Sequence, residues 1–407
     1  MTLALRQQQQ HQVRMAAPLM RTPRTVDVEI TARCNLRCRY CYFFDNPAVQ
    51  YRDLPTEEWL AFFDELGQSG VMEVTLAGGE PFLRKDLPQL VDRIVANRMR
   101  FSILSNGSLI TERIAAHLAQ TGRCNAVQVS VDGSCAEVHD ICRGTGSFES
   151  AVRGIGVLQR HHVPVTVRVT IHRYNVNDLH ETAVFLLEEL GLPAFSTNAA
   201  GYLGSCRTNA AWLMLGTEER QLAMEILLAL QRRYPGRILA SAGPMAEGVL
   251  WSRMERARAE KAAAFPAGGA LTACGCPFSR LAVRADGTYV PCTMLAYMGL
   301  GRIRRDPLSE VWQQSEGLNR LRGRHAIPLS EFDFCAGCEY LPYCSGNCPA
   351  LAYAHTGEVD YPAPDACLRS FLRSGGSLGP AWVHSHASYS PMSSRGSGHG
   401  TVHQEAG

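Results

Sequence analysis

The chain carries little net charge and lacks any long apolar run. Its 407 residues include 40 Lys and Arg against 38 Asp and Glu, so the formal net charge is +2. This near balance gives no strong electrostatic reason to expect a nucleic acid or an acidic membrane surface as a partner. The absence of a membrane-length apolar run and of a signal peptide argues against a membrane protein and against secretion.

Cysteine, by contrast, is plentiful at 15 residues. An odd number without a signal peptide argues against a secreted disulfide scaffold and suits a cytoplasmic protein whose thiolates bind metal. Cys34, Cys38 and Cys41 are separated by three and two residues. On one tight loop their thiolates can converge on three irons of a cubane and leave the fourth iron without a protein ligand. A zinc knot or three unrelated buried thiols is the alternative.

The surroundings of this loop predict a strand before it and a helix after it. Residues 26–30 alternate apolar and acidic side chains, and residues 56–69 predict a helix with Thr56 as its N-cap. Such a loop matches an active-site position of a β/α barrel. With Tyr40 just before the third cysteine, the chain resembles the radical S-adenosylmethionine (SAM) superfamily. The resemblance implies that the open iron chelates SAM and passes it an electron, which releases a 5′-deoxyadenosyl radical.

A second motif follows the next predicted strand, residues 71–77. Gly78 and Gly79 let the backbone approach a ligand closely, and Glu80 can accept a hydrogen bond from an ammonium group. In the superfamily this Gly-Gly-Glu-Pro element holds the methionyl amine of SAM. A simple turn is the alternative reading of the glycine pair.

Two further apolar runs, residues 101–104 and 126–129, end in small polar residues. Their hydroxyl, amide and carboxylate groups can hydrogen-bond a ribose or a carboxylate, although ordinary turns have the same composition. By resemblance, Ser105 and Asn106 lie on the ribose side of SAM and Ser130 and Asp132 on its carboxylate side. Arg143 is a candidate anion contact or a solvated surface residue.

Two more strand and helix units are predicted at residues 163–190 and 195–233. The resemblance therefore implies an α/β fold whose partial (β/α)6 TIM-like barrel covers residues 24–235. A helix at residues 244–265 lies in a linker, residues 236–270. Residues 1–23 and 374–407 are predicted to be disordered, since they offer little to bury.

The C-terminal third contains a second group of cysteines with many Gly, Pro and aromatic residues between them. Such a segment, short of core-forming runs, implies cross-linking by metal. Its spacing, with Gly287 between Cys276 and Cys292, resembles the SPASM extension of radical SAM enzymes, here residues 271–373, and implies two auxiliary [4Fe-4S] clusters. By resemblance, the ligands are Cys274, Cys276, Cys292 and Cys348 for the first cluster, and Cys335, Cys338, Cys344 and Cys367 for the second. Cys274 is the doubtful ligand, because a single residue separates it from Cys276; paired zinc sites are the alternative.

Together these features predict a SAM-dependent maturase that oxidatively modifies a ribosomally synthesised precursor peptide by cross-linking or excision. The resemblance implies three [4Fe-4S] clusters and a flavodoxin-type or ferredoxin-type reductant. Because about 23 residues precede the first strand, a separate protein is a possible source of leader recognition. The alternatives are a sulfatase-maturing enzyme, a small-molecule enzyme of cofactor biosynthesis, and a zinc-stapled peptide-binding protein.

Overall fold

The computed structural model describes residues 19–45, 52–379 and 382. Within them a single sheet of ten strands forms, in the order β10-β9-β8-β1-β2-β3-β4-β5-β6-β7. The strands are β1 (Thr25–Thr31), β2 (Glu73–Gly78), β3 (Arg100–Ser105), β4 (Cys124–Ser130), β5 (Val165–Ile171), β6 (Phe195–Ala199), β7 (Ile238–Ala240), β8 (Arg280–Val283), β9 (Thr288–Val290) and β10 (Gly301–Arg302).

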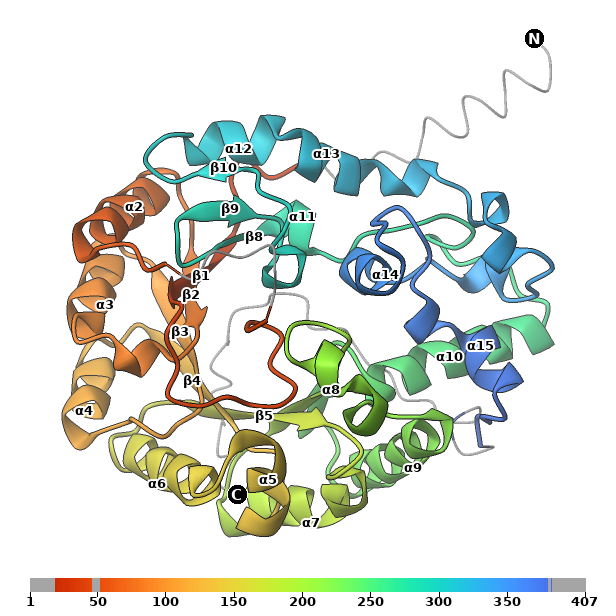
Figure 1. Ribbon diagram of the computed structural model, residues 1–407, viewed down its shortest axis with the longest axis horizontal. Helices are drawn as coiled ribbons and strands as arrows, with labels where there is room; N and C mark the ends of the chain where they lie inside the picture. Colours follow the sequence, from red (N-terminus) through yellow and green to blue (C-terminus); the bar gives the residue numbers. More distant parts are fainter. Residues whose placement is uncertain (1–18, 46–51, 380–381, 383–407) are drawn as a thin grey trace, which may run out of the picture.

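The parallel strands β1 to β7 curve into a partial barrel with helices on its outside (Figure 1). The helices flanking the barrel are α2 (Thr56–Gln68), α3 (Leu87–Ala96), α4 (Glu112–Gln120), α5 (Ala136–Arg143), α6 (Ser147–Arg160), α7 (Leu179–Val184), α8 (Cys206–Leu213), α9 (Thr217–Arg233) and α10 (Pro244–Ala259). The predicted α/β barrel is thereby confirmed, with short β7 as an addition.

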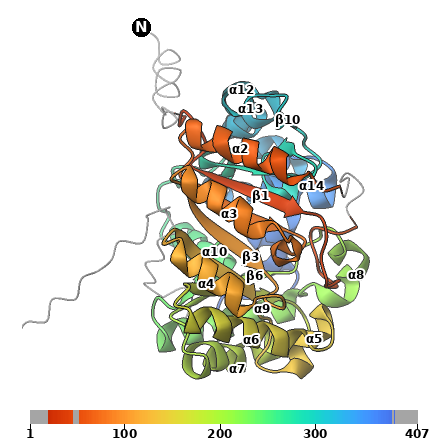
Figure 2. The ribbon, with the colours of Figure 1, turned by 90° about the vertical axis from the view of Figure 1, so that its left-hand side faces the viewer.

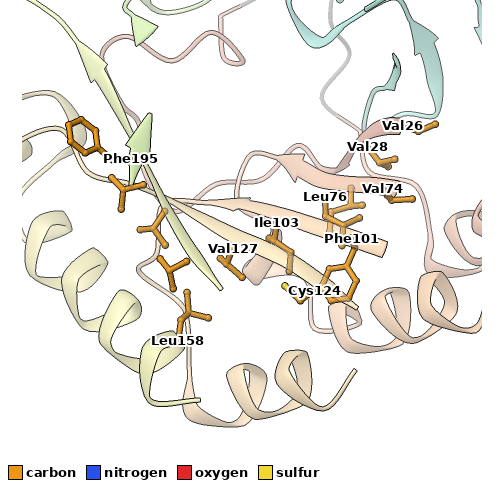
Figure 3. Packing of buried hydrophobic residues seen from close by; sticks show 14 of the residues in the cluster. Val26, Val28, Val74, Leu76, Phe101, Ile103, Cys124, Val127, Leu158 and Phe195 are labelled. Atoms are coloured by element: carbon orange, nitrogen blue, oxygen red, sulfur yellow. The ribbon is translucent and has the colours of Figure 1, made fainter. Parts of the chain in front are cut away.

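The core lies between the strands and the outer helices (Figure 3). On β1, Val26, Val28 and Ile30 are fully buried and belong to this core. Successive side chains of a strand point to opposite faces, so the intervening polar positions face the barrel interior. Helix α2 contributes Trp59, Phe62 and Phe63 to the same core. The alternation of apolar and polar residues along β1 therefore determines that polar side chains of this strand line the barrel interior.

The predicted N-cap of α2 is wrong by one position. Pro55 occupies the N-cap, and Thr56 is the first residue of the helix. The Thr56 hydroxyl instead donates to the Asp86 carboxylate at 2.7 Å. The Thr56 hydroxyl, which the sequence pattern predicted to cap the helix, therefore forms a tertiary hydrogen bond instead.

The C-terminal domain continues the barrel sheet. Strand β8 pairs in parallel with β1, and Arg280 of β8 forms an ion pair with Asp27 of β1 at 3.0 Å. The other helices of this domain are α11 (Cys276–Ser279), α12 (Leu308–Gln314), α13 (Glu316–Gly323), α14 (Pro349–Thr356) and α15 (Leu368–Arg373). Because the two domains share one sheet, Cys276, which lies just before β8, is fixed near the first strand of the barrel.

Helix α10 occupies the predicted linker region and ends at Ala259, earlier than the predicted 265. Its Trp251 and Met254 pack with side chains of α9 and of the C-terminal domain in a second apolar cluster. Trp382, in the predicted disordered tail, is buried in the same cluster. Most of the two predicted disordered ends lies outside the described residues. Within the described ranges, no helix has the length and apolar character needed to cross a membrane.

Arg220 of α9 connects the barrel to the C-terminal domain. Its guanidinium donates to Glu247 of α10 at 2.8 Å and to Asp365 at 2.9 Å, and its side chain is 11% exposed. Arg220→Met would leave two largely buried carboxylates without their cation. We expect it to lower the free energy of unfolding by roughly 3–5 kcal/mol.

Urea unfolding followed by circular dichroism measures this loss. Arg233→Met is the matched control, since Arg233 lies on the same helix and its ion pair with Glu188 is about half exposed. Exposed pairs contribute little, so this control should unfold close to the unsubstituted protein. Equal unfolding curves for the two variants would contradict the assigned role of Arg220.

Candidate active site

The three cysteines of the first motif lie on the loop that leaves the C-terminal end of β1. Figure 2 shows β1 running toward the side of the molecule where α5, α8 and α14 lie. Cys34, Cys38 and Cys41 are all partly buried and free of disulfide bonds. Burial raises the pKa of Cys41 to about 11, so the loop thiols must release protons when they bind iron.

The Gly-Gly-Glu element holds this loop through its backbone. Gly79 N donates to Thr31 O and Glu80 N donates to Arg33 O, both at 2.8 Å. A Cβ on Gly79 would lie 2.1 Å from Arg33 O, and one on Gly78, whose φ is 124°, would lie 2.2 Å from Thr31 O. The glycines are thus required for contact with the cysteine loop itself, a role that the sequence did not indicate.

A second clamp comes from the segment between β6 and α8, which sequence reasoning missed. Ser205 N donates to Cys41 O at 2.8 Å, and Asn209 Nδ2 donates to Arg39 O at 2.8 Å. At Gly204, whose φ is 50°, a Cβ would lie 2.4 Å from Cys41 O. The only sequence signal for this contact is a small-residue turn after a barrel strand. The cysteine loop is held between Gly79 on one side and Gly204 on the other.

Hydrogen-bond donors surround the loop sulfurs. Leu36 N lies 3.4 Å from Cys34 Sγ, Asn106 Nδ2 lies 3.9 Å from the same sulfur, and Arg143 Nη1 lies 3.9 Å from Cys38 Sγ. Donors of this kind stabilise thiolates and orient the ligands of iron–sulfur clusters. The donor set therefore fits a cysteine-bound cluster.

Glu80 is fully buried and organises the predicted ribose side. Its carboxylate accepts from Ser105 Oγ and Asn106 N, both at 2.8 Å, and from Phe82 N at 3.2 Å. Burial raises the pKa of Glu80 to about 7, although these hydrogen bonds oppose the rise. The structure thus brings Glu80, Ser105 and Asn106 together beside Cys34.

Asp132, Tyr40 and Arg143 also meet, but their polar groups bind one another. Asp132 is fully buried; it accepts from Tyr40 Oη, and from Arg143 Nε at 2.5 Å. Burial is the largest single influence and would raise the pKa of Asp132, but the charge and hydrogen bond of Arg143, together with the nearby His139 and His172, outweigh it and lower that pKa. Asp132 and Arg143, both predicted at the cofactor, are bonded to each other, and Arg143 also reaches Cys38 of the loop.

Ser130 is the last residue of β4 and is level with Arg168 of β5. The Arg168 side chain donates to Gln128 of β4 at 3.3 Å. Because Gln128 and Ser130 are two positions apart on one strand, they face the same side, the barrel interior. Sequence reasoning missed Arg168, since a single Arg within an apolar strand carries no motif.

The eight C-terminal cysteines separate into two groups of four. The Cys292 thiol is electrostatically affected by Cys348 and Cys274, and Cys276 by Cys274 and Cys292. A hydrogen bond from the Cys276 thiol lowers the pKa of Cys274. The doubtful Cys274 therefore lies with the first predicted set, although it is exposed.

The second set encloses a cavity. All of its cysteines line this cavity, with Met254, Leu329 and Tyr340 among the apolar side chains around it. The four are Cys335, Cys338, Cys344 and Cys367. One buried and three partly buried thiols around an apolar space suit an iron–sulfur cluster largely shielded from water. In the part of the chain that the structure describes, no three His, Cys, Asp or Glu side chains are gathered tightly enough for a single metal ion.

Comparison with known proteins agrees with both regions. The profile of the radical SAM superfamily matches residues 28–186, and that of the SPASM iron–sulfur cluster-binding domain matches residues 274–339. The Fe-coproporphyrin III synthase of Methanosarcina barkeri is 31% identical over 348 residues, which are 81% of this chain and 84% of that protein. The PqqA peptide cyclase of Rhizobium meliloti is 26% identical over 365 residues, covering 88% and 90% of the two chains.

Among solved structures, Streptococcus suis SuiB bound to its precursor peptide SuiA matches with a TM-score of 0.64. The match covers 89% of this chain and 79% of that chain at 15% identity, so it concerns the fold alone. The near full-length relative at 31% identity and the two matching profiles extend over the cysteine loop and the first part of the cysteine-rich domain. The chain therefore is an enzyme of the radical SAM superfamily with a SPASM domain.

Proposed function

We propose that this enzyme oxidatively modifies a ribosomally synthesised precursor peptide, by forming a cross-link or by excising part of a residue. The observation that carries the proposal is a group of three side chains beside the cysteine loop, Tyr174, Trp212 and Arg39, here called the rim. Tyr174 is 44% exposed and packs edge-on against Trp212 at 5.7 Å, and the Arg39 guanidinium lies 5.4 Å from the Trp212 ring. Arg, Tyr and Trp are the residues enriched where proteins bind other chains. PqqA peptide cyclase, related over nearly its whole length, acts on a peptide by its name.

The clusters and SAM, when bound, supply a 5′-deoxyadenosyl radical that can abstract a hydrogen atom from the substrate. The chain's own residues hold and orient these groups. Cys34, Cys38 and Cys41 would bind the first cluster, and the two sets of four C-terminal cysteines would bind two auxiliary clusters. With four thiols each, the auxiliary sites would carry electrons from the substrate rather than bind it. A flavodoxin-type or ferredoxin-type protein would reduce the enzyme.

Glu80 would accept from the amino group of SAM, with Ser105 and Asn106 on the ribose side and Ser130 on the carboxylate side. Because the pKa of Glu80 is about 7, its carboxyl group is mostly protonated and neutral below that pH and mostly ionised above it. An ionised carboxylate attracts an ammonium group, so SAM affinity should rise as the pH increases from about 6 to about 8.

Glu80→Gln should weaken SAM binding about tenfold or more, since a hydrogen bond to a charged group contributes about 1.5–3 kcal/mol. It should also remove most of the pH dependence. Equilibrium binding of SAM to the reconstituted protein at several pH values measures both effects. Glu73→Gln is the control, because Glu73 begins β2, the strand that ends two residues before Glu80, and its carboxylate accepts from Ser102 Oγ, away from the loop. A pH dependence that persists in Glu80→Gln would contradict the assignment.

A tetrapyrrole substrate is the second candidate, favoured by the 31% identity to Fe-coproporphyrin III synthase. The two candidate functions are distinguished by which substrate the enzyme converts. The reduced holoenzyme with SAM is incubated with a candidate precursor peptide, sought among short reading frames beside its gene, or with a coproporphyrin-type tetrapyrrole. We expect a peptide mass lowered by a hydrogen pair or by an excised fragment, with 5′-deoxyadenosine formed in proportion. Conversion of the tetrapyrrole alone would overturn the peptide proposal.

The rim gives a sharper version of this test. Trp212→Ala removes the ring that contacts both Tyr174 and Arg39, so it should weaken peptide binding. The matched control is Met72→Ala, because Met72 is 55% exposed and lies just before β2, at the opposite end of that strand from the cysteine loop. Equal peptide affinity in the Trp212 and Met72 variants would remove the rim from the proposal.

A further inference from the structure

A buried ion pair supports the cysteine loop from below. Arg143 Nε lies 2.5 Å from Asp132 Oδ2, and the two side chains are 8% and 0% exposed. The other carboxylate oxygen of Asp132 accepts from Thr170 N at 2.8 Å. A buried pair of charges is stable only when its remaining hydrogen-bonding groups are satisfied, and these contacts satisfy Asp132.

The backbone of Asp132 is fixed as firmly as its side chain. Asn175 Nδ2 donates to Asp132 O at 2.8 Å, and Asp132 N donates to His139 Nδ1 at 3.0 Å. Burial lowers the pKa of His139 to about 4, so this imidazole is neutral and can accept. Three elements of the barrel therefore hold one carboxylate in a single orientation, which in turn holds Arg143.

The held guanidinium reaches the cysteine loop. Arg143 Nη1 lies 3.9 Å from Cys38 Sγ, and the guanidinium carbon lies 5.4 Å from the centre of the Tyr40 ring. The Tyr40 hydroxyl donates to Asp132. The ion pair thus touches the loop at a cysteine and at an aromatic residue two positions later.

We propose that Arg143 is a positioning residue for the cluster of Cys34, Cys38 and Cys41, donating to the Cys38 thiolate and raising the reduction potential of that cluster. Asp132 is the group that aims it. One electron from a flavodoxin-type or ferredoxin-type reductant enters the cluster, and no bond is made or broken. The added negative charge is stabilised by a fixed positive charge in a water-poor site. The inference rests on superfamily membership, so it stands or falls separately from the peptide proposal.

The test is a redox titration of the reconstituted holoenzyme followed by electron paramagnetic resonance. The signal of the loop cluster is assigned by its loss in the Cys34/Cys38/Cys41→Ala variant. Arg143→Met should lower the midpoint potential of this signal, and Arg143→Lys, which keeps the charge on a shorter reach, should lower it less. Arg39→Met is the matched control: Arg39 lies in the same loop but is exposed and turned to Trp212, so its removal should leave the potential unchanged.

Arg143→Met leaves the buried Asp132 charge without its partner, which endangers folding. The double variant Arg143→Met/Asp132→Asn removes both charges with little change in the size of residue 132, and its potential is read if the single variant loads no cluster. A potential equal to that of the unsubstituted enzyme in either variant would overturn the proposal. Unchanged potential with weakened SAM binding would assign Arg143 to the anion of SAM instead. An equal shift in Arg39→Met would show that nearby charge alone sets the potential.

Discussion

Replacement of Cys34, Cys38 and Cys41 by alanine is expected to abolish 5′-deoxyadenosine formation and to remove about four of about twelve irons per chain. The count follows from three four-iron clusters, each held by cysteine thiolates. The loop cysteines lie at the end of β1, whereas the other two sets belong to the C-terminal domain, so the eight auxiliary irons should remain. The loss of activity should be complete, because no other described cysteine lies on this loop.

Anaerobic reconstitution followed by iron, sulfide and zinc analysis measures the metal content, and chromatography after reduction with SAM measures the product. Cys124→Ala is the matched control, since Cys124 is buried in β4 and belongs to none of the three sets. It should keep full iron and activity. Zinc in place of iron, with no deoxyadenosine from the unsubstituted protein, would support a metal-stapled binding protein and contradict the three-cluster proposal.

The barrel was predictable from the sequence because its signals are local. Each apolar run, such as the one containing Val74 and Leu76, is followed within a few residues by its small polar turn. The sequence therefore predicted which strand each motif follows and at which end of that strand the motif lies. The predicted strand of residues 26–30 corresponds to β1 at Thr25–Thr31, and the helix of residues 217–233 to α9.

Contacts between distant segments were not predictable in the same way. Pairing of β8 with β1 joins residues about 250 positions apart, as in Thr25 beside Arg280, and no local pattern encodes that register. Gly204 contacts Cys41, about 160 positions earlier in the chain, and belongs to no motif. Asp132 and Arg143 were both predicted as candidate site residues, but their contact with each other was not predictable from the sequence. Sequence patterns thus identified candidate site residues more readily than the distant residues that each of them contacts.

Adding a methyl group to the glycines that clamp the cysteine loop is the second change with a large expected effect. In Gly79→Ala the new Cβ would lie 2.1 Å from Arg33 O and 3.0 Å from Cys34 N. These are backbone atoms, which cannot turn aside as a flexible side chain can. The loop must move away from β2, and the hydrogen bond between Glu80 N and Arg33 O is lost with it.

Gly204→Ala should act from the opposite side. Its Cβ would lie 2.4 to 2.6 Å from the carbonyl oxygens of Cys41, Tyr42 and Phe44, and its φ of 50° is costly for a residue with a side chain. Either variant should therefore bind roughly four fewer irons per chain and lose 5′-deoxyadenosine formation, as the triple cysteine variant does, while all its cysteines remain.

Gly156→Ala is the matched control, because Gly156 lies within α6 and its Cβ would meet only the end of the Arg160 side chain at 3.4 Å. Alanine in a helix interior is favoured over glycine by roughly 0.5–1 kcal/mol, so this variant should gain stability and keep all its iron. Iron analysis and thermal unfolding of the three variants decide the matter. Full iron in Gly79→Ala and Gly204→Ala would mean that the loop binds its cluster without the two clamps. The loss of iron in both, with auxiliary clusters intact, would show that ligand geometry at Cys34 and Cys41 depends on backbone packing from β2 and from the segment before α8.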